Sequence, residues 1–92
     1  LGSDALEYFL ARLRAASPEA AADPSAAAAS AALLAGRFDQ AFASLVPADP
    51  TLLSTAFLKG LALLGKGDSV TASDRFREAI DIAPDFLPAA FY

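Results

Sequence analysis

One stretch of the chain decides the fold: residues 50–84, PTLLSTAFLKGLALLGKGDSVTASDRFREAIDIAP. Its first half is apolar on nearly every side of a helix, and its second half repeats apolar residues every three or four positions. Between the halves stands Gly65-Lys66-Gly67-Asp68, and glycine at the end of one helix with Asp before the next is typical of a turn between helices. We therefore predict two antiparallel helices, over about 50–64 and 68–82.

Glycine at position 60 lies inside the first of these predicted helices, where it costs about 1 kcal/mol relative to alanine. Close approach of a second helix would offset that cost. The apolar stripe of the second helix has the small residues Ala72 and Ala79, with Phe76 between them. We expect these side chains to meet Gly60 across the hairpin, so that a larger residue at position 60 would overpack it.

Helical periodicity and Pro or Gly punctuation continue on both sides of this stretch. The spacing Leu6, Phe9, Leu10, Leu13 gives the first predicted helix one apolar face. Asp23-Pro24 predicts an N-cap and a first helical residue, and Asp49-Pro50 repeats that signal, which predicts a helix start at Pro50. The remaining predicted helices cover about 4–16, 24–36 and 38–46, and a last one begins after Pro84 and continues to Tyr92. Short gaps favour antiparallel neighbours, and the fold class is all-α with about five or six helices.

Composition bounds what this single domain, residues 1–92, can do. Apolar residues are 55% of the chain, but 24 of them are Ala, a strong helix former. The absence of His and Cys excludes disulfides, Cys/His zinc sites and Ser-His or Cys-His catalysis. The net charge of −4 argues against a nucleic-acid partner. No run approaches the roughly 20 apolar residues of a membrane-spanning helix, and no compartment is indicated.

Catalytic chemistry would have to rest on carboxylates, Lys, Tyr or Ser. Asp74 and Glu78 share a helix face, but that face is the charged side of an amphipathic helix and is typical of solvated surface. Lys59 stands on an apolar helix, where we expect it to extend its charge outward or to pair with an acid. We predict no catalytic, cofactor-binding or metal-binding residue, and hence a protein that is not an enzyme.

The spacing within residues 53–86 resembles the tetratricopeptide repeat family. The residues that carry this resemblance are Gly60, Leu63, Ala72, Phe76, Ala79 and Pro84. It implies a right-handed solenoid of stacked helical hairpins. Residues 50–86 would form a full repeat, residues 23–49 a shortened one, residues 4–16 a further N-terminal helix, and residues 87–92 the start of another repeat. Ala56 and Lys59 depart from the family pattern, which has a large aromatic residue and a Leu there.

The resemblance also implies a function and a binding surface. The inner wall of the full repeat would consist of Ser54, Phe57, Leu61 and Leu64, which suit an apolar or helical ligand. Packing of the same residues against a neighbouring helix of this chain is the equal alternative. The leading hypothesis is a non-enzymatic scaffold that binds a protein or peptide within a larger protein.

The apolar C-terminal end suggests a second hypothesis. Phe86, Leu87, Phe91 and Tyr92 would begin a helix that no following helix covers. Because repeat arrays need a polar outer face at their ends, this segment would continue into more of the natural protein or contact a second copy. The alternative function is therefore a self-assembly or packing module that forms a homodimer.

Overall fold

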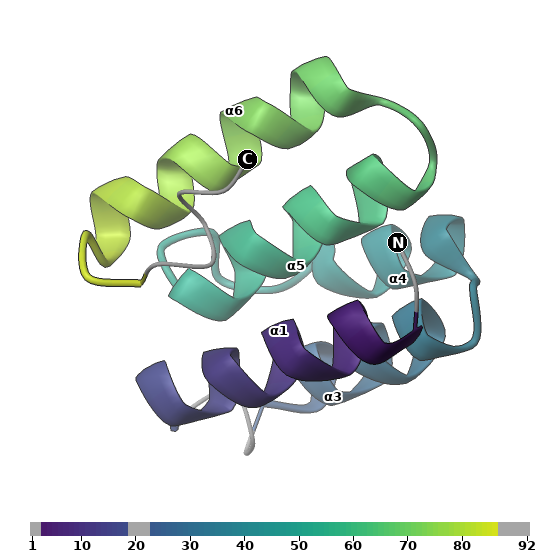
Figure 1. Ribbon diagram of the computed structural model, residues 1–92, viewed down its shortest axis with the longest axis horizontal. Helices are drawn as coiled ribbons and strands as arrows, with labels where there is room; N and C mark the ends of the chain where they lie inside the picture. Colours follow the sequence, from purple (N-terminus) through teal and green to yellow (C-terminus); the bar gives the residue numbers. More distant parts are fainter. Residues whose placement is uncertain (1–2, 19–22, 87–92) are drawn as a thin grey trace.

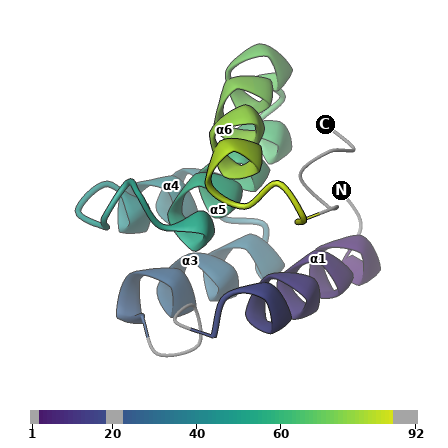
Figure 2. The same cartoon turned by 90° about the vertical axis from the view of Figure 1, so that its left-hand side faces the viewer.

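Helix α5, Leu53–Gly65, runs through the middle of the molecule with the other helices around it (Figures 1 and 2). The structure is a computed structural model and describes residues 3–18 and 23–86. The other helices of this part are α1 (Ser3–Ala16), α3 (Pro24–Leu34), α4 (Phe38–Leu45) and α6 (Ser69–Ile82). The described residues contain helices and turns and no strand. The predicted all-α class is confirmed.

The central place of α5 follows from its composition. Apolar side chains surround this helix, so each of its faces needs another element against it. Figure 2 looks along the helix: α6 lies on one side, α4 on another, and α1 and α3 together on a third. Ten of the 13 residues of α5 are buried as a result.

Helices α5 and α6 form the hairpin expected from residues 50–84. Gly67 adopts a positive φ of 89° in the turn, a conformation that suits glycine. The Asp68 carboxylate then accepts a hydrogen bond from the Thr71 N–H at 3.2 Å and caps α6. A Cβ atom built on Gly60 would lie 2.5 Å from Cε1 of Phe76, so the two helices meet where glycine leaves room for the ring.

The two Asp-Pro signals form different structures. Asp23 accepts a hydrogen bond from the Ser25 N–H at 3.0 Å, and α3 begins directly at Pro24. Asp49 accepts from both the N–H and the hydroxyl of Thr51, at 2.9 and 2.7 Å, and this local turn delays the helix. The prediction that a helix begins at Pro50 is therefore wrong, because α5 begins at Leu53.

Helix α1 packs back onto the other helices through one face. Its Leu6, Phe9, Leu10 and Leu13 are buried, and the Phe9 ring contacts the Phe57 ring edge-to-face at 6.2 Å between centroids. In Figure 2 it lies beside α3 and below α5. The molecule measures 28 × 27 × 25 Å along its principal axes, so it is nearly as thick as it is long.

The contact between Gly60 and Phe76 generates the first prediction. Gly60→Val should lower the free energy of unfolding by about 1–3 kcal/mol, because the added methyl groups overpack a buried ring. Urea unfolding would measure the change. In a Phe76→Leu background the same substitution should cost markedly less. An equal loss in both backgrounds would contradict the contact.

The Asp49 turn generates a prediction about pH. The Thr51 N–H and hydroxyl hold the pKa of the Asp49 carboxyl below 3.8, its ordinary value, because both stabilise the carboxylate. Its stabilising contribution is therefore present above that pH and is lost as the pH falls through the folded-state pKa. Asp49→Ala should lower the melting temperature slightly at neutral pH, and this deficit should shrink as the pH falls below 3.8. Thermal melts over a series of pH values from neutral into acid test this, and a deficit of constant size over the series would contradict it.

Candidate functional site

Most of the expected ligand wall is inside the molecule. Ser54, Phe57 and Leu61 are 1%, 0% and 0% exposed, and Leu64 is half-buried. The prediction that the first three face a ligand is wrong, because other parts of this chain, α1 and Phe86 among them, cover that face. Packing within the chain, the alternative interpretation, describes these residues.

The Phe57 ring shows what fills this face. Its centroid lies 6.2 Å from that of Phe9, 5.5 Å from that of Phe76 and 4.8 Å from that of Phe86. These three rings come from α1, α6 and the segment after α6. Phe57 is thus enclosed by elements from both ends of the chain, and no ligand reaches it.

The expected oligomer contact also needs correction at one residue. Phe86 is 5% exposed and stands edge-to-face on Phe57. It is a core residue, so it does not present an apolar surface to a second copy. Leu87, Phe91 and Tyr92 lie outside the described residues, and their predicted role stays a prediction.

The residues expected to pack the hairpin lie mostly at its interior. Ala72, Phe76 and Ala79 are buried on α6. Leu63 is buried on α5 with 7% exposure. Pro84 is exposed after the end of α6.

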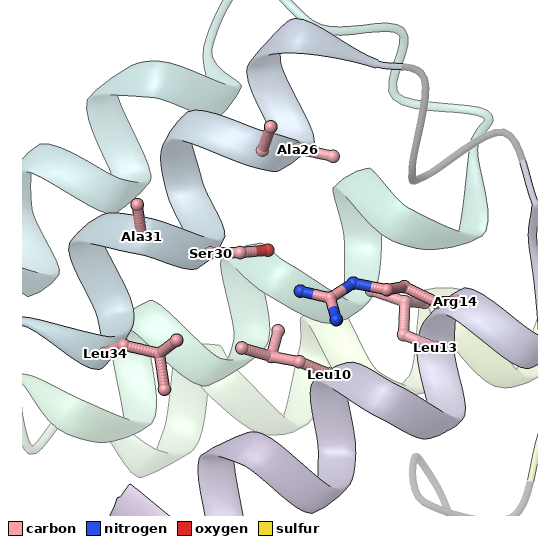
Figure 3. A pocket seen from close by; sticks show the side chains of 8 residues that line it. Leu10, Leu13, Arg14, Ala26, Ser30, Ala31 and Leu34 are labelled. Atoms are coloured by element: carbon pink, nitrogen blue, oxygen red, sulfur yellow. The ribbon is translucent and has the colours of Figure 1, made fainter.

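A groove lies between α1 and α3 (Figure 3). Its volume is about 300 Å³, at the lower end of the range for ligand-binding sites. Helix α1 contributes Leu10, Leu13 and Arg14, and α3 contributes Ala26, Ala27, Ser30, Ala31 and Leu34. We call this site the α1–α3 groove.

The alanine content of α3 explains why the α1–α3 groove exists. Where α3 has Leu33, its side chain is fully buried in the core. On the side toward the groove, Ala27 and Ala31 stand one turn apart and are exposed. Their methyl groups are too short to fill the space beside α1. Alanine thus forms the helix readily and leaves its neighbour incompletely covered. Sequence reasoning missed this site, although the Ala-rich run was its signal.

Two polar side chains converge over the apolar walls of the groove. Figure 3 shows the Arg14 guanidinium extending from α1 toward the hydroxyl of Ser30 on α3. Both groups can donate hydrogen bonds. Within residues 3–18 and 23–86, the ion pairs are Lys66–Asp39 and Arg75–Glu78, each at 2.7 Å, so Arg14 has no carboxylate partner there.

Lys59, the cation expected on the apolar helix, lies on α5 and places its Nζ 5.9 Å from the centre of the Phe42 ring.

Two hydroxyls in the first turn of α5 are buried without a hydrogen-bond partner, those of Ser54 and Thr55. Elsewhere, Ser44 donates to the carbonyl oxygen of Gln40, four residues earlier. Ser54 and Thr55 cannot do the same, because the carbonyls four residues before them belong to the turn that precedes α5.

No group of three or more acidic, His or Cys side chains in the described part of the chain could hold a metal ion. No helix there has the length and apolar character to cross a membrane.

Comparison with protein-family models, with curated proteins and with solved structures finds no match to this chain.

The unpartnered hydroxyl of Thr55 generates a prediction. Thr55→Val keeps the shape of the side chain and removes a buried polar group, so it should raise the free energy of unfolding by about 1 kcal/mol. Ser44→Ala, which removes an exposed hydroxyl, should change it little. Denaturant unfolding of both variants measures the effect. Destabilisation by Thr55→Val would mean that the hydroxyl is bonded in the folded protein.

Proposed function

We propose that this chain is a non-enzymatic interaction module that binds a protein or peptide in the α1–α3 groove. The observation that carries the proposal is the groove itself. Two helices form its apolar walls, and two hydrogen-bond donors, the Arg14 guanidinium and the Ser30 hydroxyl, point toward each other there. Such a surface offers buried area and orientation to a ligand. It is half open, which suits a side-chain-bearing segment of another protein better than an enclosed small molecule.

The chemistry of the groove supports binding over catalysis. The guanidinium of Arg14 is a hydrogen-bond donor only, which suits it to hold a ligand group. Ser30 has no base among the groove residues to activate its hydroxyl. Of the acid pair considered from the sequence, Glu78 is held by two hydrogen bonds from Arg75, at 2.9 and 2.7 Å. That arrangement is surface ion pairing, and it lies on α6, away from the groove.

The proposal includes the relation to tetratricopeptide repeats. In it, α3 with α4 and α5 with α6 are two consecutive hairpins of the kind that family stacks. The contact between Gly60 and Phe76 supports this relation, since it requires the close approach of two helices that the repeat spacing implies. Helix α1 then lies across the wall formed by α3 and α5, so the site for a partner moves from that wall to the seam between α1 and α3.

The test blocks the groove and leaves the core intact. Ala31 is exposed and lines the groove, whereas Ala28 is exposed on the same helix and does not line it. Ala31→Phe should cover the groove with a ring, and Ala28→Phe is the matched control with the same added apolar area. The probe is a displayed library of alanine-based helical peptides of about 16 residues, long enough to form helix. Positions on one face vary among Ala, Leu, Phe, Glu, Gln and Lys.

Peptides selected on the unaltered chain should bind Ala31→Phe at least about tenfold more weakly, and should bind Ala28→Phe equally well. Fluorescence anisotropy gives the dissociation constants, and circular dichroism verifies that both variants are folded. Binding that Ala31→Phe leaves unchanged would overturn the proposal. Light scattering on the same samples tests the alternative partner: a dimer lost in Ala31→Phe alone would make the partner a second copy of this chain.

A further inference from the structure

We infer that the α1–α3 groove takes an amphipathic helix that places a carboxylate between Arg14 and Ser30 and an apolar side chain one turn away. This inference rests on the proposed function and names the chemistry of the partner. Three features of the groove carry it: the pair of donors, the absence of a counter-charge, and the position of the leucines.

The donors face each other across the groove. Arg14 reaches over from α1 and the Ser30 hydroxyl points toward it from α3, with apolar side chains around both (Figure 3). A carboxylate only accepts hydrogen bonds when ionised, and a guanidinium only donates them. A carboxylate between the two residues would therefore accept from both helices at once. An ammonium group there would meet a fixed positive charge.

No counter-charge from the described chain occupies this position. Arg14 makes no ion pair within residues 3–18 and 23–86. Asp23 stands before α3, but its carboxylate accepts from the Ser25 N–H and caps the helix. The whole chain carries a net charge of −4, which repels acidic partners at long range. Recognition of an acid at Arg14 is therefore a local effect that selects one position on the partner.

The apolar part of the groove lies one helical turn from the donors. Leu10 precedes Arg14 by four residues on α1, and Leu34 follows Ser30 by four residues on α3. Because residues four apart share a helix face at a separation of about 6 Å, both leucines stand at the same end of the groove, as Figure 3 shows. Leu34 is 40% exposed and still has surface to bury.

Alanine on α3 favours a helix as the partner. Ala27 and Ala31 form a seam of small side chains along the groove, which lets another backbone come close. A helix can present an apolar residue and an acid at i and i+4 on one face. This spacing matches the step between the leucine end and the donor end.

The experiment reverses the charge at the groove. Selections with the helical peptide library are run on the unaltered chain, on Arg14→Glu and on Arg12→Glu. Arg12 is exposed on α1 and does not line the groove. Arg12→Glu is therefore the matched control, because it changes the net charge by the same amount as Arg14→Glu. On the unaltered chain and on Arg12→Glu, selected peptides should have Glu one turn from a Leu or Phe. On Arg14→Glu, Lys should replace that Glu.

Replacing the selected Glu by Gln should weaken binding to the unaltered chain about two- to fivefold, the size expected of an exposed ion pair, and should not weaken binding to Arg14→Glu. Equal peptide charge in all three selections, with binding still lost in Ala31→Phe, would overturn this inference and leave the proposed function standing. Absence of any peptide sensitive to Ala31→Phe would overturn both.

Discussion

The burial of one ring, Phe57, connects the parts of this fold. It belongs to the central helix α5 and contacts rings from α1, from α6 and from the segment after α6. Aromatic side chains contribute large buried areas and favour the tilted and edge-to-face geometries found here. Since Phe9 and Phe86 are far apart in the chain, their shared contact with Phe57 closes the core around α5. A 92-residue chain whose commonest residue is alanine has few large side chains for a core, and it gathers four of its seven phenylalanines at this point.

The helices could largely be predicted from the sequence, whereas their arrangement could not. Periodicity and capping residues are local signals, and they located α1, α3, α4, α5 and α6 within a few residues. The start of α5 was misplaced, because Thr51 adds a hydroxyl donor to the Asp49 turn that Ser25 does not add at Asp23. The all-round apolar pattern of α5 indicated burial, but it does not distinguish a ligand from a helix of the same chain. Helix α1 covers part of α5 through the contact of Phe9 with Phe57, and its apolar spacing gave no sign of which surface it would cover.

The glycines illustrate the same limit at single residues. Gly36 and Gly67 have positive φ, and their place after a helix is a sufficient local signal for a turn. Gly60 and Gly65 have no such conformation, and a Cβ on either would collide with a phenylalanine ring, Phe76 or Phe38. Gly60 could be interpreted from the sequence because it interrupts a helix. Gly65 stands at the helix end, where a turn explains it equally well, so its contact with α4 became visible only in three dimensions.

Alanine content also determines where this molecule leaves a groove. An apolar face of large residues would have packed fully against α1, as Leu33 packs into the core. The short side chains of α3 stabilise the helix and leave a groove, and Arg14 stands at that groove without a carboxylate from the described chain. The burial of α5 and the incomplete packing beside α3 therefore have one origin: the large apolar residues are concentrated on α1, α4 and α5, and the small ones on α3. A partner helix with larger side chains would complete the packing that α3 cannot provide for itself.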